Sequence, residues 1–325
     1  MSASEAEGCA FKSRRAQILS GLLAALVLPG RAGAQALATL EVAGPPNDTG
    51  GLLFYAADMG FYEKAGLRVR VTSLANSGSI SSAIASGSVQ IGSFAVSVGA
   101  LAHEKGLPLV MIAPAGLYLS SAPTSGLIVP KNSPIRKASD LNGKTIATRD
   151  ISNMSYFGAK QWIDKNGGDS KSIHWIEIPD TGDVPALESG RIDAASVSEP
   201  ALDDALRSGE IRSLAPVFDA IGKRFLISGY FTSEDFAKAH PDVVRKFADV
   251  MGVTARWANG NRARSGQILE KYAQATVLPG STRITYAERL SAADVQPVLD
   301  LLLKYGLLKA PMRAKDMFSS LVPSQ

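Results

Sequence analysis

Residues 37–66 read LATLEVAGPPNDTGGLLFYAADMGFYEKAG, and their order decides the fold class. The apolar run 37–43 predicts a strand, which Gly44-Pro45-Pro46 ends. Asn47-Asp48-Thr49 is typical of a helix cap, and the helix expected over 51–64 is closed by Gly66. A short apolar strand followed at once by a capped helix is the repeating unit of α/β folds.

The same alternation continues outward from this stretch. We expect strands at 68–73, 89–92, 109–114, 127–129, 144–148, 174–178, 192–197 and 226–231, with helices at 80–85, 96–104, 154–166, 184–189 and 200–208. Beyond Ser233 the pattern favours helices alone, at 241–259, 262–273, 286–291 and 293–305. A long helical tail is hard to fit as more parallel sheet, so we expect it to pack on the first half of the fold.

These elements predict an α/β fold of two lobes, joined by two crossings near 128–131 and 226–228, with a helical C-terminal tail. The expected boundaries are 35–129 for the first part of lobe 1, 130–227 for lobe 2, and 228–325 for the completion of lobe 1 and the C-terminal helices. A cleft between two such lobes is a common place for a ligand.

The first 34 residues read as a signal peptide. Lys12, Arg14 and Arg15 precede an apolar run over 18–28, and Ala32-Gly33-Ala34 offers a cleavage site. A run of about 11 residues is too short to span a bilayer, and the alternative is an amphipathic or buried N-terminal helix. Ser13-Arg14-Arg15 loosely resembles a twin-arginine signal, but the following residues match it poorly, so we favour the Sec route and a periplasmic location.

Charge and cysteine content exclude several classes of function. The net charge is +4, and four basic and two acidic residues fall within the first 34, so the remainder carries about +2. No basic tract suggests nucleic acid. Cys9, the single cysteine, precedes the apolar run, so the processed chain has no disulfide, thiol nucleophile or cysteine-bound metal. The three histidines lie in separate elements, and we expect no catalytic residue, metal or cofactor.

Several segments together resemble one family. Ala56-Ala57-Asp58-Met59-Gly60-Phe61-Tyr62-Glu63-Lys64-Ala65-Gly66-Leu67 is similar to the A-x-x-x-G-F-F/Y-x-x-x-G-L segment of the NMT1/SsuA-like (nitrate, sulfonate and taurine type) solute-binding proteins of ABC transporters. Further similar segments follow in the family's order over about 37–260, at 85–92, 140–147, 188–194, 198–200 and 240–247. The resemblance implies the type II periplasmic binding protein fold.

The resemblance also implies a function and partners. It implies a monomeric receptor that delivers a small-molecule ligand to a membrane permease and its ATPase. Among the family's cargoes, an alkyl sulfonate resembling taurine is our first choice, with nitrate and a thiamine pyrimidine precursor as alternatives. A sensor that presents its ligand to a membrane receptor is a second class. The family's thiamine-synthesis enzymes form a third, but their cysteine-rich iron motif is absent here.

The ligand is expected beyond the carboxyl ends of the strands, where helix N-termini attract anions. Arg149 could bind a carboxylate or sulfonate through two parallel hydrogen bonds, or it could form a surface ion pair with Asp150. Glu199 could orient other groups, accept from a ligand amine or repel wrong anions. Tyr55, Tyr118 and Tyr156 could line an apolar wall or fill core. The Ser, Asn and Gly residues could equally be ordinary turn residues. The predicted ligand-binding residues are Asn47, Thr49, Gly50, Asn76, Ser77, Gly78, Ser97, Ser121, Arg149, Ser152, Asn153, Tyr156 and Glu199.

Overall fold

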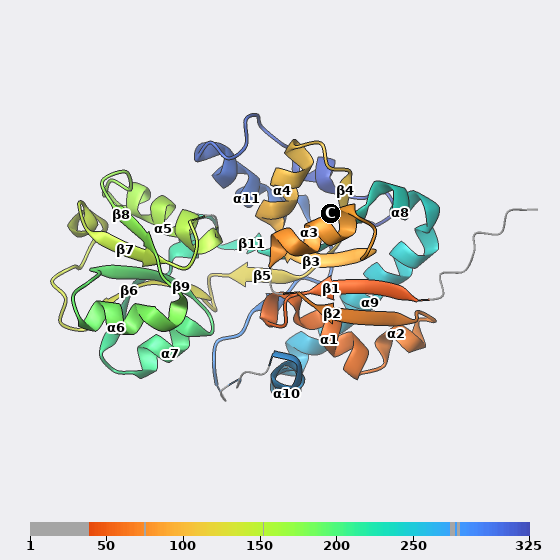
Figure 1. Ribbon diagram of the computed structural model, residues 1–325, viewed down its shortest axis with the longest axis horizontal. Helices are drawn as coiled ribbons and strands as arrows, with labels where there is room; N and C mark the ends of the chain where they lie inside the picture. Colours follow the sequence, from red (N-terminus) through yellow and green to blue (C-terminus); the bar gives the residue numbers. More distant parts are fainter. Residues whose placement is uncertain (1–38, 75, 152, 274–276, 278–279) are drawn as a thin grey trace, which may run out of the picture. The chain divides into compact units, whose positions relative to one another are not determined.

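Two five-stranded sheets form the framework of the protein (Figure 1). The computed structural model describes residues 39–325 except 75, 152, 274–276 and 278–279, so the predicted signal peptide lies outside the described residues. The first sheet has the order β2-β1-β3-β12-β4. Its strands are β1 (Leu40–Gly44), β2 (Val69–Ser73), β3 (Ile91–Ala95), β4 (Leu109–Pro114) and β12 (Ser228–Ser233).

Strand direction places the ends of the first sheet. β1 pairs parallel with β2 and β3, and β12 is antiparallel to both β3 and β4. The carboxyl ends of β1, β2, β3 and β4 therefore share one edge with the start of β12. Because β12 comes from a distant part of the chain, this sheet is discontinuous in sequence.

The second sheet has the order β10-β6-β9-β7-β8. Its strands are β6 (Ser125–Pro130), β7 (Thr145–Thr148), β8 (His174–Glu177), β9 (Ala194–Ser198) and β10 (Ile211–Ala215). β7 pairs parallel with β8 and β9, whereas β6 is antiparallel to β9 and β10. Residues 127–129, expected to end the first lobe, lie within β6, so the chain changes sheets before residue 125.

A small third sheet accompanies the two crossings of the chain. Its order is β11-β5-β13, from β5 (Gly116–Leu119), β11 (Arg224–Leu226) and β13 (Thr285–Tyr286). The helix expected over 286–291 was wrong. Tyr286 pairs with Gly116 in β13, and the Ala287 amide donates to the Ala115 carbonyl, so long-range pairing overrides the local helical preference.

Helices cover both sheets (Figure 1). Those of the first sheet are α1 (Gly51–Asp58), α2 (Phe61–Lys64), α3 (Ser77–Ala85), α4 (Val96–Glu104), α8 (Glu234–Ala239), α9 (Pro241–Gly260), α10 (Arg262–Ala273) and α11 (Ala292–Lys304). The helix expected over 51–64 is split, because Gly60 adopts φ of 65° and separates α1 from α2. The C-terminal helices pack on the first sheet's layer as expected: α9 and α10 contact α1, and α11 contacts α4.

The second sheet carries α5 (Met154–Lys165), α6 (Asp183–Glu188) and α7 (Ala201–Arg207). Short 3-10 turns complete the chain: η1 (Asp48–Gly50), η2 (Ala138–Leu141), η3 (Asp180–Gly182), η4 (Val217–Ala220) and η5 (Ala314–Met317). Within the described residues, no helix is both long and apolar enough to cross a bilayer.

The core of the first sheet is rich in aromatic side chains. Phe94 and Phe231 stack across β3 and β12 with ring centroids 4.2 Å apart, and both are fully buried. Tyr55 and Tyr118 are also fully buried, so they fill core and neither forms an exposed apolar wall. This packing fixes the strands whose ends carry the predicted ligand-binding loops.

Candidate functional site

The loop between β1 and α1 is the best-anchored of the predicted ligand-binding loops. The side-chain oxygen of Asn47 accepts from the Thr49 amide at 3.0 Å and from its hydroxyl at 2.7 Å. The Thr49 carbonyl accepts from the hydroxyls of Ser93, at 3.4 Å, and Ser228, at 3.1 Å. Hydroxyls from β3 and β12 thereby hold the start of α1, and Gly50 is buried within this loop.

An ion pair between the buried Arg283 and the half-buried Asp48 anchors the same loop. The Arg283 guanidinium binds Asp48 at 2.5 Å and donates to the Tyr55 hydroxyl at 2.7 Å. The Tyr286 hydroxyl donates to the Asp48 carbonyl at 2.7 Å. Burial by itself lowers the pKa of Arg283, but the hydrogen bonds and charge of Asp48 outweigh it and leave that pKa above its usual value. Burial raises the pKa of Tyr55 to about 12, so its hydroxyl stays protonated.

The other predicted residues near the first sheet differ in exposure. Asn76 caps α3, where its side chain accepts from the amides of Gly78 and Ser79 at 2.8 and 3.1 Å. Asn76 and Gly78 are exposed, and Ser77 is half-buried. Ser97 lies in the first turn of α4 with only 5% of its surface exposed. These residues share the carboxyl edge of the first sheet.

Arg149 lies at the carboxyl end of β7 in the second sheet. Its guanidinium is exposed and pairs with Asp180 at 3.3 Å, across the ends of β7 and β8. Asn153 caps α5 by accepting from the Tyr156 amide at 2.8 Å. The half-buried Tyr156 ring contacts Trp175 with centroids 4.8 Å apart. Ser152 lies outside the described residues, and Ser121 is exposed in the turn before β6.

Glu199 ends β9 at the same edge of the second sheet. Burial raises the pKa of Glu199 to about 8, so its carboxyl is largely protonated at neutral pH. Its side chain accepts from the Asp203 amide at 3.1 Å. Asp203 in turn accepts from the Thr282 amide at 2.8 Å, which ties α7 to the residue preceding Arg283. The loops that follow β9 and β1 are therefore linked through two adjacent residues.

Asp183 is a second acidic residue near this edge, at the start of α6. Its residue surface is 1% exposed, and neither carboxyl oxygen has a hydrogen-bond partner. Burial, and then the charge of Asp180, raise the pKa of Asp183 to about 7. Two carboxyls near the predicted ligand loops are thus held largely or partly neutral at neutral pH, which reduces the repulsion of an anion.

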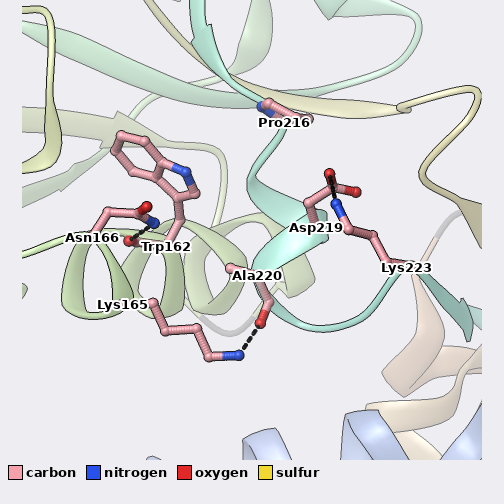
Figure 2. A pocket seen from close by; sticks show the side chains of 7 residues that line it. All are labelled: Trp162, Lys165, Asn166, Pro216, Asp219, Ala220 and Lys223. Carbon is pink, nitrogen blue, oxygen red and sulfur yellow. Dashed lines mark hydrogen bonds and ion pairs between the residues drawn. The ribbon is translucent and has the colours of Figure 1, made fainter.

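A cavity of about 370 Å³ lies elsewhere in the second lobe, at the C-terminal end of α5 (Figure 2). Its two lysines are already engaged: Lys165 donates to the Ala220 carbonyl at 2.7 Å, and Lys223 pairs with Asp219 at 2.6 Å. None of the predicted ligand-binding residues lines it. The predicted ligand-binding residues lie instead at the strand ends, where neutral donors and helix N-termini gather.

The described residues contain no group of three or more His, Cys, Asp or Glu side chains arranged to hold a metal. The polar groups at the two edges include hydroxyls, amides, the exposed Arg149 guanidinium, two carboxyls of raised pKa, and the carboxylates Asp48 and Asp180, which are paired with arginines. Such an arrangement can bind an anion by hydrogen bonds. A family model described as NMT1/THI5 like matches residues 47–261, which include both edges. The chain belongs to this family.

This NMT1/THI5-like chain is similar in sequence to the taurine-binding periplasmic protein of Escherichia coli. The two are 30% identical over 195 residues, and the chain spans 58% of that protein's length, with 59% of its own. The resemblance inferred from the short motifs is thereby confirmed.

Solved structures confirm the expected fold. The aliphatic sulphonate binding protein SsuA from Escherichia coli has a TM-score of 0.72 at 17% identity, covering 86% of this chain and 97% of that one. The nitrate-binding protein NrtA from Synechocystis has a TM-score of 0.69 at 15% identity, covering 88% and 87%. The desulfurization enzyme DSZB also shares the fold, with a TM-score of 0.64 at 16% identity, covering 86% and 96%. At these identities the likeness establishes the periplasmic binding protein fold and no ligand.

Sequence reasoning missed the residues that anchor the β1–α1 loop in this family member. Asp48 was assigned only to a cap, and Arg283, Tyr286 and Asp203 were not considered. Asp48 and Arg283 are 235 positions apart in sequence, and no local pattern connects them. Residues 281–287 read STRITYA, and nothing in this stretch marks Arg283 as a buried residue.

Proposed function

We propose that the protein is an extracytoplasmic solute-binding protein of an ABC importer, and that it captures a small organic anion. An alkyl sulfonate resembling taurine is the first choice. The observation that carries the proposal is the anchored loop at the start of α1. Its Asp48 charge is balanced by Arg283, and the Thr49 carbonyl is occupied by Ser93 and Ser228. The partial positive charge at the start of α1 can therefore attract an anion without an opposing net charge from Asp48.

Side chains at the edge of the second sheet favour an organic anion over an inorganic anion as the ligand. Tyr156 offers a half-buried aromatic face at the start of α5, next to the Asn153 cap. Such a face can contact the carbon chain of an alkyl sulfonate, whereas nitrate has no carbon chain to contact. Glu199, with its pKa raised to about 8, can lose its proton and accept from a ligand amine. The taurine-binding relative agrees with this choice, because taurine carries both a sulfonate and an amine.

A thermal-shift and calorimetric panel tests the ligand class. Taurine, ethanesulfonate, nitrate, acetate and a thiamine pyrimidine would each be added to the purified protein. A ligand that binds only the folded state at 100 times its Kd stabilises it by about 2.7 kcal/mol. We expect taurine and ethanesulfonate to give the largest shifts. Stabilisation by nitrate or the pyrimidine alone would replace the sulfonate assignment, and no response to any anion would refute the proposal.

An uptake experiment in cells distinguishes a role in import from a role in sensing. If the protein serves an importer, deleting its gene should abolish uptake of the labelled ligand found in the panel. A sensor would leave uptake intact and change only a transcriptional response. If the purified protein converted the ligand to a product, it would instead be an enzyme. DSZB, which shares the fold, is a desulfurization enzyme.

A further inference from the structure

Arg283 has every hydrogen-bond donor of its side chain in use. Nε donates to Asp48, Nη2 to Asp48 and the Tyr55 hydroxyl, and Nη1 to the Arg262 carbonyl at 2.9 Å and the Ser265 hydroxyl at 3.0 Å. A guanidinium has five N–H donors, so none remains for a ligand. Its side chain is also only 7% exposed. Arg283 therefore does not contact the ligand directly.

Asp48, by contrast, lies in the loop proposed to receive the ligand. Its side chain is 24% exposed, and it belongs to the 3-10 turn that leads into α1. A helix N-terminus has a partial charge of about +0.5, whereas an unpaired carboxylate beside it carries a full negative charge. Without a cation, Asp48 would thus outweigh the attraction of the helix for an anion.

We propose that Arg283 is a positioning residue for anion binding, which holds the Asn47–Gly51 loop in place and cancels the charge of Asp48. The inference rests on the proposed function and names the residue that makes its site selective for anions. Tyr286 shares the task, because its hydroxyl donates to the Asp48 carbonyl and its ring meets Tyr55 edge-on at 6.1 Å. Arg283 and Tyr286 thereby hold the loop in place without contacting the ligand themselves.

Variants that remove one charge or both charges of the Asp48–Arg283 pair test this role. Arg283→Met leaves Asp48 bare and should weaken the binding of taurine and ethanesulfonate by about tenfold or more, measured by calorimetry. The double variant Asp48→Asn/Arg283→Met restores the balance and should recover most of that loss. Asp48→Asn alone retains Arg283 and a hydrogen-bonding side chain, so it should bind both probes at least as tightly as the wild type.

A merely structural role predicts the opposite pattern. Each lost partner would then weaken binding, so the double variant would be no better than Arg283→Met, and Asp48→Asn would also bind less tightly. Either result overturns the proposal. Arg256→Met is the matched control, since it removes another Arg–carboxylate pair, with Glu288 at 2.9 Å, from the same layer. It should leave affinity unchanged.

A measurement without ligand separates this inference from the proposed function. Hydrogen–deuterium exchange of the amides of residues 47–53 should quicken in Arg283→Met and stay unchanged in Arg256→Met. If the wild type binds neither sulfonate, the proposed function fails, and faster exchange still supports Arg283 as the residue that positions the loop. Unchanged exchange in Arg283→Met overturns the positioning role, whatever the ligand. Asp48→Asn provides the same readout if Arg283→Met does not fold, with a smaller increase expected.

Discussion

Replacement of Asp183 by Asn should stabilise the protein, and more so as the pH rises. Both oxygens of this carboxyl are buried without a hydrogen-bond partner, so its charged form is strongly disfavoured in the folded state. Asn has nearly the same shape and cannot ionise. The substitution therefore removes the buried charge and leaves a neutral polar group in its place.

The size of the effect follows from the pKa of Asp183. The pKa of an ordinary Asp is 3.8, and burial raises the pKa of Asp183 to about 7 in the folded protein. The folded state holds this proton longer than the unfolded state, so stability falls as the pH rises through the window between those two values. With about 1.4 kcal/mol for each unit, the total loss is about 4 kcal/mol once the pH is above both. We expect Asp183→Asn to exceed the wild type by about 2 kcal/mol near pH 5 and by about 4 kcal/mol near pH 8.

Urea unfolding followed by tryptophan fluorescence at several pH values measures this difference. Glu188→Gln is the control, because it removes an exposed carboxyl from the same helix. Its curve of stability against pH should run parallel to that of the wild type. If the Asp183→Asn curve also ran parallel to the wild type between about pH 4 and 8, Asp183 would not be a buried, unpartnered acid.

Three further substitutions test the site and the core. Glu199→Gln should remove the fall in affinity for ethanesulfonate, an anion without an amine, that the wild type shows between about pH 7 and 9, as the Glu199 carboxyl of pKa about 8 ionises; calorimetry at several pH values gives the comparison. Gly99→Ala places a Cβ 2.5 Å from the Phe231 ring and should cost about 1–3 kcal/mol in urea unfolding, whereas Gly260→Ala meets open space and should not destabilise. Phe94→Ala leaves a cavity against Phe231 and should cost about 3–5 kcal/mol.

The parts of the fold that sequence predicted are those set by local signals. The bounds of α4, β4 and α10 agree with the expected 96–104, 109–114 and 262–273, and Gly106, Pro108 and Pro114 mark three of these ends as breakers. The cap at Asn47 was found for the same reason, since a cap bonds to an amide two or three residues away.

The parts that sequence did not predict depend on partners far along the chain. β5 is a four-residue strand whose ladder partners are β11 and β13, both far along the chain, so nothing in residues 116–119 themselves required a strand. Arg149 was weighed against a pair with its neighbour Asp150, and the structure pairs it with Asp180, which a different strand brings close. Whether Arg149 or the other predicted residues contact the ligand stays a prediction.

The adjacency of Thr282 and Arg283 has an energetic consequence under the proposed function, in which the protein opens to admit its ligand. Thr282 is joined to Asp203 of α7 by one backbone hydrogen bond, whereas Arg283 is joined to its surroundings by an ion pair and several hydrogen bonds. A single hydrogen bond to a charged group contributes about 1.5–3 kcal/mol, and Arg283 makes several such bonds. Any separation of the two edges therefore breaks the Asp203 contact first and leaves Asp48 neutralised. The Asn47–Gly51 loop, which we propose binds the anion, would thus keep its charge balance in the open protein, where an incoming ligand first meets it.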